Sequence, residues 1–117
     1  MQFVEINLEE VCSAQPKLSE EKIKEYLRKG IDWVTKQMQI KPPPVQTYRW
    51  NEQKITELVD GFHRCRALYD KGIRNISATY EGEKESTDKP PIKLKDAQVL
   101  NKKEYRIWAI TQQTNPK

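Results

Sequence analysis

Apolar positions recur at two different spacings along the chain, and the changes of spacing predict the order of its elements. Residues 2–6 (QFVEI) are short and rich in β-forming side chains, and Asn7 can cap a brief turn after them. Between residues 20 and 38 the apolar side chains recur every three or four positions, which predicts one helix with an apolar stripe. Ser19 supplies its N-cap, and Gly30 is a point where the helix can kink or break.

A stiff connector leads from this helix into a region of β-type sequence. The run KPPP at 41–44 removes amide donors, so it can form neither helix nor central strand. Residues 45–50 and 55–59 are β-prone, and the four polar residues between them have the length of a hairpin turn. The sequence therefore predicts an antiparallel hairpin.

Helical spacing returns directly after the dipeptide Asp60-Gly61. Phe62 begins a short amphipathic segment for which Gly72 is placed as the C-terminal glycine. Period-two spacing resumes over residues 76–80, which predicts a further strand. The middle of the chain therefore reads as strand, turn, strand, helix and strand.

The last third of the chain has a weaker pattern. Residues 81–91 (EGEKESTDKPP) hold no large apolar side chain, which predicts a flexible loop. Residues 92–117 form a C-terminal extension, in which we expect a strand near 105–111. We expect residues 1–117 to be a single domain with its core at about 2–80.

Composition narrows the classes of protein to which the chain can belong. The 117 residues are 36% hydrophobic and 32% charged, with a net charge of +4 that favours anionic partners. Cys12 and Cys65 form no CxxC or Cys/His cluster, which argues against a disulfide framework or a zinc site. No apolar run is long enough to span a membrane. We therefore expect a soluble cytoplasmic protein.

The strand-to-helix junction is where the residue types point to chemistry. Gly61 permits a tight turn, and the amides from Phe62 onward leave the helix end with a partial positive charge that suits a phosphate. His63 and Arg64 add side-chain donors. Asp60 can hold a magnesium ion or act as a base. The plainer alternative is an amphipathic helix packed on a sheet, with these charged side chains in solvent.

The segment ELVDGFHRCRALYDKGIRNISATY resembles the core shared by ParB N-terminal domains, sulfiredoxins and free serine kinases. The resemblance implies an α+β fold: a small mixed β-sheet with a long N-terminal helix and a short helix after the Asp-Gly turn. It also implies a nucleotide, ATP or CTP, bound with Mg²⁺. The residues expected to bind its phosphates are Gly61, Phe62, His63, Arg64 and Arg66, and those expected to act in catalysis are Asp60, which would also hold the magnesium ion, and His63.

Departures from the family pattern leave the activity open. Phe62 stands where sulfiredoxins have their catalytic cysteine, and Cys65 lies on the apolar stripe, so sulfinic acid reduction is disfavoured. One expectation is a nucleotide-phosphate-binding domain associated with DNA, in a partition, regulatory, plasmid or phage role. The second is a magnesium-dependent phosphotransferase, NTPase or nuclease of the same superfamily. The third is a ligand-free protein-interaction module, and a homodimer is compatible with each.

Two further groups of side chains have both a functional and a structural interpretation. Tyr48 and Trp50 alternate with Arg49 on the predicted hairpin and can stack bases, although sheet core is the favoured interpretation. A basic strip beside the site is the other candidate, and an ordinary solvated surface is again favoured for it. The strip comprises Lys93, Lys95, Lys102, Lys103 and Arg106.

Overall fold

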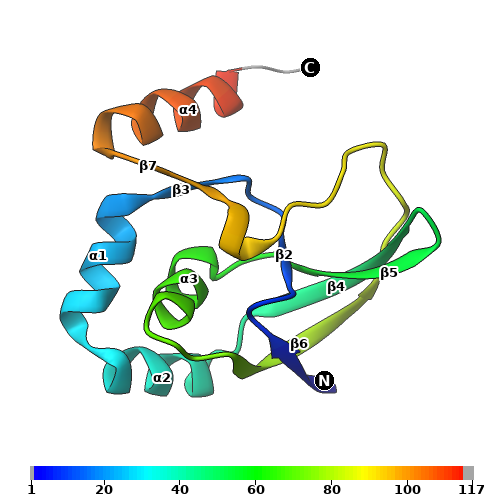
Figure 1. Ribbon diagram of the computed structural model, residues 1–117, viewed down its shortest axis with the longest axis horizontal. Helices are drawn as coiled ribbons and strands as arrows, with labels where there is room; N and C mark the ends of the chain where they lie inside the picture. The colour runs from blue at the N-terminus through cyan, green and yellow to red at the C-terminus, as the bar shows by residue number, and fades with distance from the viewer. Residues whose placement is uncertain (1, 115–117) are drawn as a thin grey trace.

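The computed structural model describes residues 2–114, with side chains up to residue 112. Within this range the chain forms a five-stranded mixed sheet, a separate pair of parallel strands and four α-helices (Figure 1). The α+β class is confirmed. The sheet order is β1 (Gln2–Asn7), β6 (Asn75–Glu83), β4 (Pro44–Trp50), β5 (Gln53–Leu58) and β2 (Cys12–Ser13). The pair is β3 (Lys17–Ser19) and β7 (Gln98–Leu100). The helices are α1 (Glu20–Lys29), α2 (Ile31–Ile40), α3 (Phe62–Asp70) and α4 (Lys102–Thr114), with a 3₁₀ turn at Leu94–Asp96.

The predicted hairpin is present with a tighter turn than expected. β4 and β5 pair antiparallel, and only Asn51 and Glu52 separate them. Both residues have positive φ, 48° and 66°, which is the backbone that a two-residue turn between twisted strands requires. β6 runs parallel to β4 and continues to Glu83, so residues 81–83 belong to a strand and not to the predicted loop.

The long helix predicted over residues 20–38 is divided into two helices at Gly30, the point at which a kink or break was expected. Gly30 has φ of +94°, and its amide donates to the carbonyls of Tyr26 and Leu27 at 3.2 Å each. This backbone ends α1 and starts α2 at once, since only glycine adopts it without strain. The break lets α2 turn away from α1, as Figure 1 shows.

The strand predicted near 105–111 is also wrong, because this segment is part of α4. Asn101 caps the helix: its side chain accepts from the Glu104 amide at 2.9 Å, and its own amide donates to the Glu104 carboxylate at 3.2 Å. This reciprocal pair is a capping box, which stabilises a helix start. The sequence carried that signal, whereas the alternation that suggested a strand was weak.

The core lies between the sheet and the helices α1, α2 and α3. The sheet contributes Ile6, Val45, Leu58 and Ala78, all buried. The chain beyond residue 80 also reaches this core, through Leu94 and Ala97, so the core extends past the 2–80 range expected from sequence. The helical members are Ile23, Val34, Met38, Cys65, Ala67 and Leu68.

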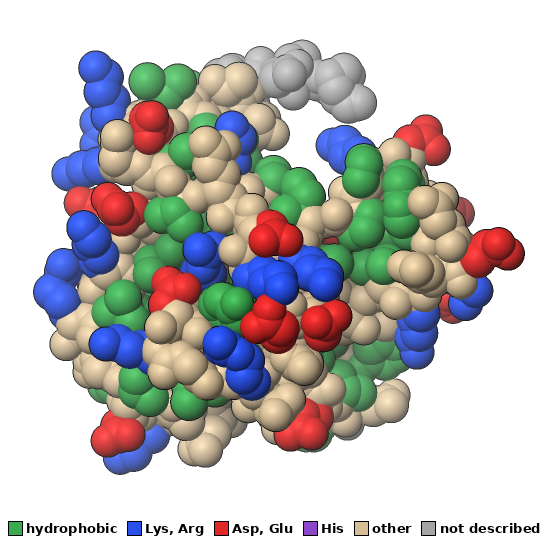
Figure 2. Space-filling model, in the orientation of Figure 1, with side chains coloured by type: hydrophobic (Ala, Val, Ile, Leu, Met, Phe, Trp, Pro, Cys, Tyr) green, Lys and Arg blue, Asp and Glu red, His purple; other side chains and the backbone are tan. Residues whose placement is uncertain are grey.

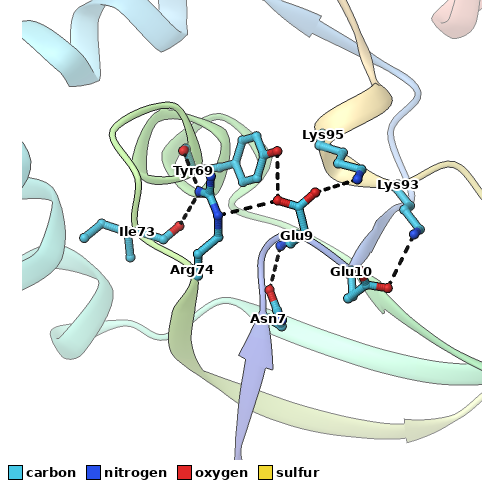
Figure 3. Close-up of polar contacts among 8 residues, drawn as sticks. All are labelled: Asn7, Glu9, Glu10, Tyr69, Ile73, Arg74, Lys93 and Lys95. Atoms are coloured by element: carbon cyan, nitrogen blue, oxygen red, sulfur yellow. Dashed lines mark hydrogen bonds and ion pairs between the residues drawn. The ribbon is translucent and has the colours of Figure 1, made fainter.

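A charged cluster fastens the first turn of the chain to the end of α3. On the face drawn in Figure 2, acidic and basic side chains gather near the centre, and Figure 3 shows the contacts. Glu9 accepts from the hydroxyl of Tyr69 at 3.1 Å and pairs with Arg74 at 3.5 Å and with Lys95. The hydrogen bond from Lys95 is the main cause that lowers the pKa of Glu9 below its usual value. Lys95, a member of the predicted basic strip, therefore has a structural role.

No helix within residues 2–114 is long and apolar enough to cross a bilayer.

Candidate functional site

The turn between β5 and α3 is built around a glycine that the local packing requires. Gly61 has φ of +77°, and its amide donates to the side chain of Asp60 at 2.8 Å. A Cβ at this position would lie 3.1 Å from Nη2 of Arg64 and 3.2 Å from Cβ of Pro43. The Arg64 guanidinium therefore lies close over the turn, in space that a side chain at position 61 would take.

The N-terminus of α3 presents free amide donors at this turn. The first helical hydrogen bond runs from the Cys65 amide to the Gly61 carbonyl at 3.0 Å. The amides of Phe62, His63 and Arg64 have no acceptor among the residues described, and no side chain caps the helix. Three N–H groups thus remain at the positive end of the helix dipole, which is a favourable position for an anion.

His63 is held as a neutral imidazole. The Ser19 amide donates to Nε2 of His63 at 2.9 Å, so the proton lies on Nδ1. Burial, with a smaller contribution from the charge of Lys22, lowers the pKa of His63 to about 4. In this state the ring offers Nδ1–H as a hydrogen-bond donor, whereas a catalytic base would need a free lone pair.

A pocket of about 410 Å³ opens at this turn and collects most of the predicted site residues. Asp60, Gly61, Phe62, His63 and Arg64 all line it. Helices α1, α2 and α4 and the segments beside them add further side chains that the sequence did not single out. These are Gln15, Lys22, Tyr26, Trp33, Gln37, Lys41 and Tyr105.

The pocket has an excess of positive charge. Its described lining contains three cations, Lys22, Lys41 and Arg64, against one carboxylate, Asp60. None of the three cations forms an ion pair within the described part of the chain. An anion that entered the pocket would therefore meet positive charges not already neutralised by a neighbour.

Arg66, the remaining predicted phosphate ligand, lies outside this lining. Its Nη1 donates to the carbonyls of Leu94 and Ala97 at 3.2 Å each, and its Nε pairs with Asp70 at 3.1 Å. These bonds fasten the 3₁₀ turn to α3. Cys65 is fully buried, and burial raises the pKa of its thiol to about 12, which fits the structural role expected for it.

The aromatic residues of the hairpin and the basic strip, both considered as binding surfaces from the sequence, include residues with structural roles. Tyr48 is 2% exposed and belongs to the core. Lys93 and Lys102 pair with Glu10 and Glu21, at 3.4 and 3.8 Å. The predicted strip is therefore partly neutralised.

Sequence reasoning missed the lining residues contributed by α1, α2 and α4. Lys22 and Tyr26 are four residues apart on α1, and Trp33 and Gln37 are four apart on α2, so each pair shares one helix face. That spacing can be recognised in the sequence. Their convergence on the Gly61 turn cannot, because it depends on the break at Gly30.

Divalent metal binding has limited support from protein side chains alone. No group of three or more His, Cys, Asp or Glu side chains that could hold a metal ion occurs among the described residues. Mg²⁺ is commonly held by one or two carboxylates together with substrate phosphates and water. Asp60 fits that pattern as a single carboxylate, since only its Oδ1 accepts the Gly61 amide.

Comparison with known proteins bears on the fold alone. No protein-family model matches the sequence, and no curated protein matches it. The solved structure of protein Atu1540 from Agrobacterium tumefaciens is similar, with a TM-score of 0.52 and 13% sequence identity. The match covers 98% of this chain and 48% of that one, so the chain spans about half the length of its structural neighbour.

Proposed function

We propose that the pocket at the Gly61 turn binds the phosphate groups of a nucleotide. The observation that carries this proposal is the meeting of the free α3 amides with Arg64, Lys22 and Lys41, none of them ion-paired within residues 2–114. Helix N-termini with neighbouring cations bind phosphate through charge-assisted hydrogen bonds. His63 adds a neutral N–H donor at the same place.

The resemblance to the ParB/sulfiredoxin superfamily supports the same proposal. The Asp-Gly-x-His-Arg positions that carry it, Asp60 to Arg64, line the pocket. On this basis we propose a ParB-like domain that binds ATP or CTP and is associated with DNA in the cytoplasm. Arg66 supports the site indirectly, since it positions the 3₁₀ turn behind α3.

A magnesium-dependent phosphotransferase or nuclease of this superfamily is the second candidate. Asp60 favours it, because the carboxylate borders the same pocket and keeps Oδ2 for other partners. Mg²⁺ bound to Asp60 and to phosphate oxygens would neutralise charge on the phosphate. Turnover that needs Mg²⁺ and disappears in Asp60→Ala, with nucleotide binding retained, would establish this candidate.

A thermal-shift panel tests the phosphate site directly. ATP, CTP, GTP, ADP and inorganic tripolyphosphate are each titrated with Mg²⁺ against the wild type, Arg64→Ala and Arg28→Ala. Arg28 is the matched control, because it is an exposed arginine of α1 outside the pocket lining. A ligand at 100 times its Kd stabilises the native state by about 2.7 kcal/mol, which such an assay detects.

The expected result is stabilisation of the wild type and of Arg28→Ala but not of Arg64→Ala. If Arg64→Ala responds like Arg28→Ala, the phosphate binds elsewhere. If no polyphosphate or nucleotide stabilises any of the three proteins, the interaction-module alternative takes its place. Sedimentation of the purified chain would then show whether the partner is a second copy.

A further inference from the structure

Two aromatic groups contribute to the pocket lining. Trp33 of α2 stacks with Tyr26 of α1, with ring centroids 6.4 Å apart and an interplanar angle of 27°. Tyr105 of α4 lies edge-on to His63 at 5.9 Å and next to Trp108 at 5.6 Å. Trp33 remains 38% exposed, so part of its ring is accessible to a ligand.

A lysine from one face of α1 lies over a ring of each aromatic group. The Lys22 ammonium lies 5.3 Å from the centroid of Tyr105, and the Lys29 ammonium lies 4.4 Å from that of Trp33. Lys22 and Lys29 are separated by two helical turns, which correspond to about 10 Å along the axis. The two groups therefore contact α1 at different turns, and we call them the Trp33 platform and the Tyr105 platform.

The anion-binding elements share one pocket lining with both platforms. His63 follows Gly61 and contacts the Tyr105 platform. Arg64 lies against Gly61 together with Pro43, and it lines the same pocket as Trp33. A phosphate at the α3 amides would therefore share one pocket with Trp33 and Tyr105, so a base on each side of a phosphodiester has a ring on which it can stack.

We infer that the ligand of this pocket is single-stranded nucleic acid, with a phosphodiester at the N-terminus of α3 and flanking bases stacked on Trp33 and Tyr105. The inference rests on the proposed phosphate site and names its ligand class. A free nucleotide has one base and would use one platform, whereas a strand uses both. Lys22 and Lys41 of the same lining then supply positive charge for the adjoining phosphates. Stacking accepts any base, so binding is expected to depend little on sequence.

Fluorescence anisotropy with labelled oligothymidylate of about 10 nucleotides tests the inference, with thymidine triphosphate and tripolyphosphate as competitors. The variants are Trp33→Leu and Tyr105→Leu. Trp50→Leu is the matched control, because Trp50 ends β4 and is outside the pocket lining. Loss of one stacked base is expected to weaken oligonucleotide binding between about 5-fold and 100-fold, with tripolyphosphate binding unchanged.

The conservative variants keep the inference testable if a leucine variant folds poorly. Trp33→Tyr and Tyr105→Phe retain a ring and are expected to bind within about 3-fold of the wild type. Oligouridylate and a DNA duplex complete the panel. Comparable affinity for RNA and DNA single strands is expected, and tighter binding of the duplex would overturn the inference.

Failure of the inference and failure of the phosphate site give different results. If Arg64→Ala abolishes binding while both leucine variants match Trp50→Leu, the phosphate site holds and the stacking platforms do not. Equal affinity for thymidine triphosphate and the oligonucleotide would likewise reject the strand in favour of a mononucleotide. If Arg64→Ala changes neither tripolyphosphate nor oligonucleotide binding, the phosphate site itself is rejected.

Discussion

The backbone amide of Ser19 donates a hydrogen bond to Nε2 of His63 at 2.9 Å, and this bond joins the starts of α1 and α3. Ser19 is also the N-cap of α1, because its hydroxyl accepts from the Lys22 amide at 3.2 Å. One residue therefore positions both the histidine and the first turn of the helix that carries Lys22. Protonation of His63 at Nε2 would break this connection, since an imidazolium has no acceptor.

The bond predicts how stability depends on pH. The pKa of His63 is lowered from 6.5 to about 4, so between these values the unfolded chain binds more protons than the folded one. Stability should therefore fall as pH decreases from 6.5 to 4. The expected contribution is about 1–2 kcal/mol, because the ring is partly exposed and its interactions are partly screened. Urea denaturation at a series of pH values measures it.

His63→Gln is the control for this pH dependence. It removes the titrating ring and keeps an amide oxygen that can accept a hydrogen bond. Carboxylates titrate in both proteins, so only the difference between the two stability curves belongs to His63. Parallel curves from pH 6.5 to 4 would mean that the folded ring is protonated as easily as the unfolded one.

The sequence predicted the local geometry of the site but not its full lining. Asp60, Gly61 and the helix from Phe62 follow from turn and helix chemistry within a few residues, and that part of the α+β fold was predicted. Tyr105 could not be placed, because residues 105–111 were predicted as a strand and not as part of α4. Trp33 lies beyond Gly30, where a kink or break was expected, but the sequence does not give the direction in which α2 turns.

Gly61→Ala is predicted to lower stability and also to disturb binding. The left-handed backbone costs a non-glycine residue about 1–2 kcal/mol, and the added Cβ would press on Arg64 and Pro43. Gly72→Ala is the matched control at the other end of α3: its φ is +93°, but a Cβ there meets nothing within 4 Å. Denaturation should detect a loss in both variants. Tripolyphosphate binding should weaken only in Gly61→Ala, and equal binding by both would contradict the contact with Arg64.

Asn101→Ala should loosen α4 and with it Tyr105. Loss of the cap removes the bond to the Glu104 amide, which is expected to cost about 1 kcal/mol of helix stability. Tyr105 would then hold its hydrogen bond from Gln15, 3.0 Å in length, less of the time. Hydrogen exchange of the α4 amides should become faster, and Asn101→Asp, which keeps an acceptor, should restore protection. Unchanged exchange in Asn101→Ala would show that packing alone holds the helix.

Salt dependence offers a count of the cations that contact the ligand. A single strand releases counterions with a slope of about −0.7 per neutralised phosphate in a plot of log affinity against log salt. If Lys22, Lys41 and Arg64 each neutralise one phosphate charge, the expected slope is about −2 for oligothymidylate. Arg64→Ala should reduce its magnitude by about 0.7, and Arg28→Ala should leave it unchanged. A slope that Arg64→Ala does not alter would place Arg64 outside the contact.

Asp60→Asn separates the electrostatic role of this carboxylate from its role in the turn. The asparagine oxygen can still accept the Gly61 amide, so the fold should be retained. Without Mg²⁺, the negative charge of Asp60 opposes a phosphate in the pocket, and its removal should strengthen binding by about 5-fold. With Mg²⁺, the wild type should gain affinity through a metal held between Asp60 and the phosphate, whereas Asp60→Asn should gain little. Equal Mg²⁺ dependence in the two proteins, measured by titration after EDTA treatment, would assign the metal to the nucleotide alone and remove the main support for a magnesium-dependent enzyme.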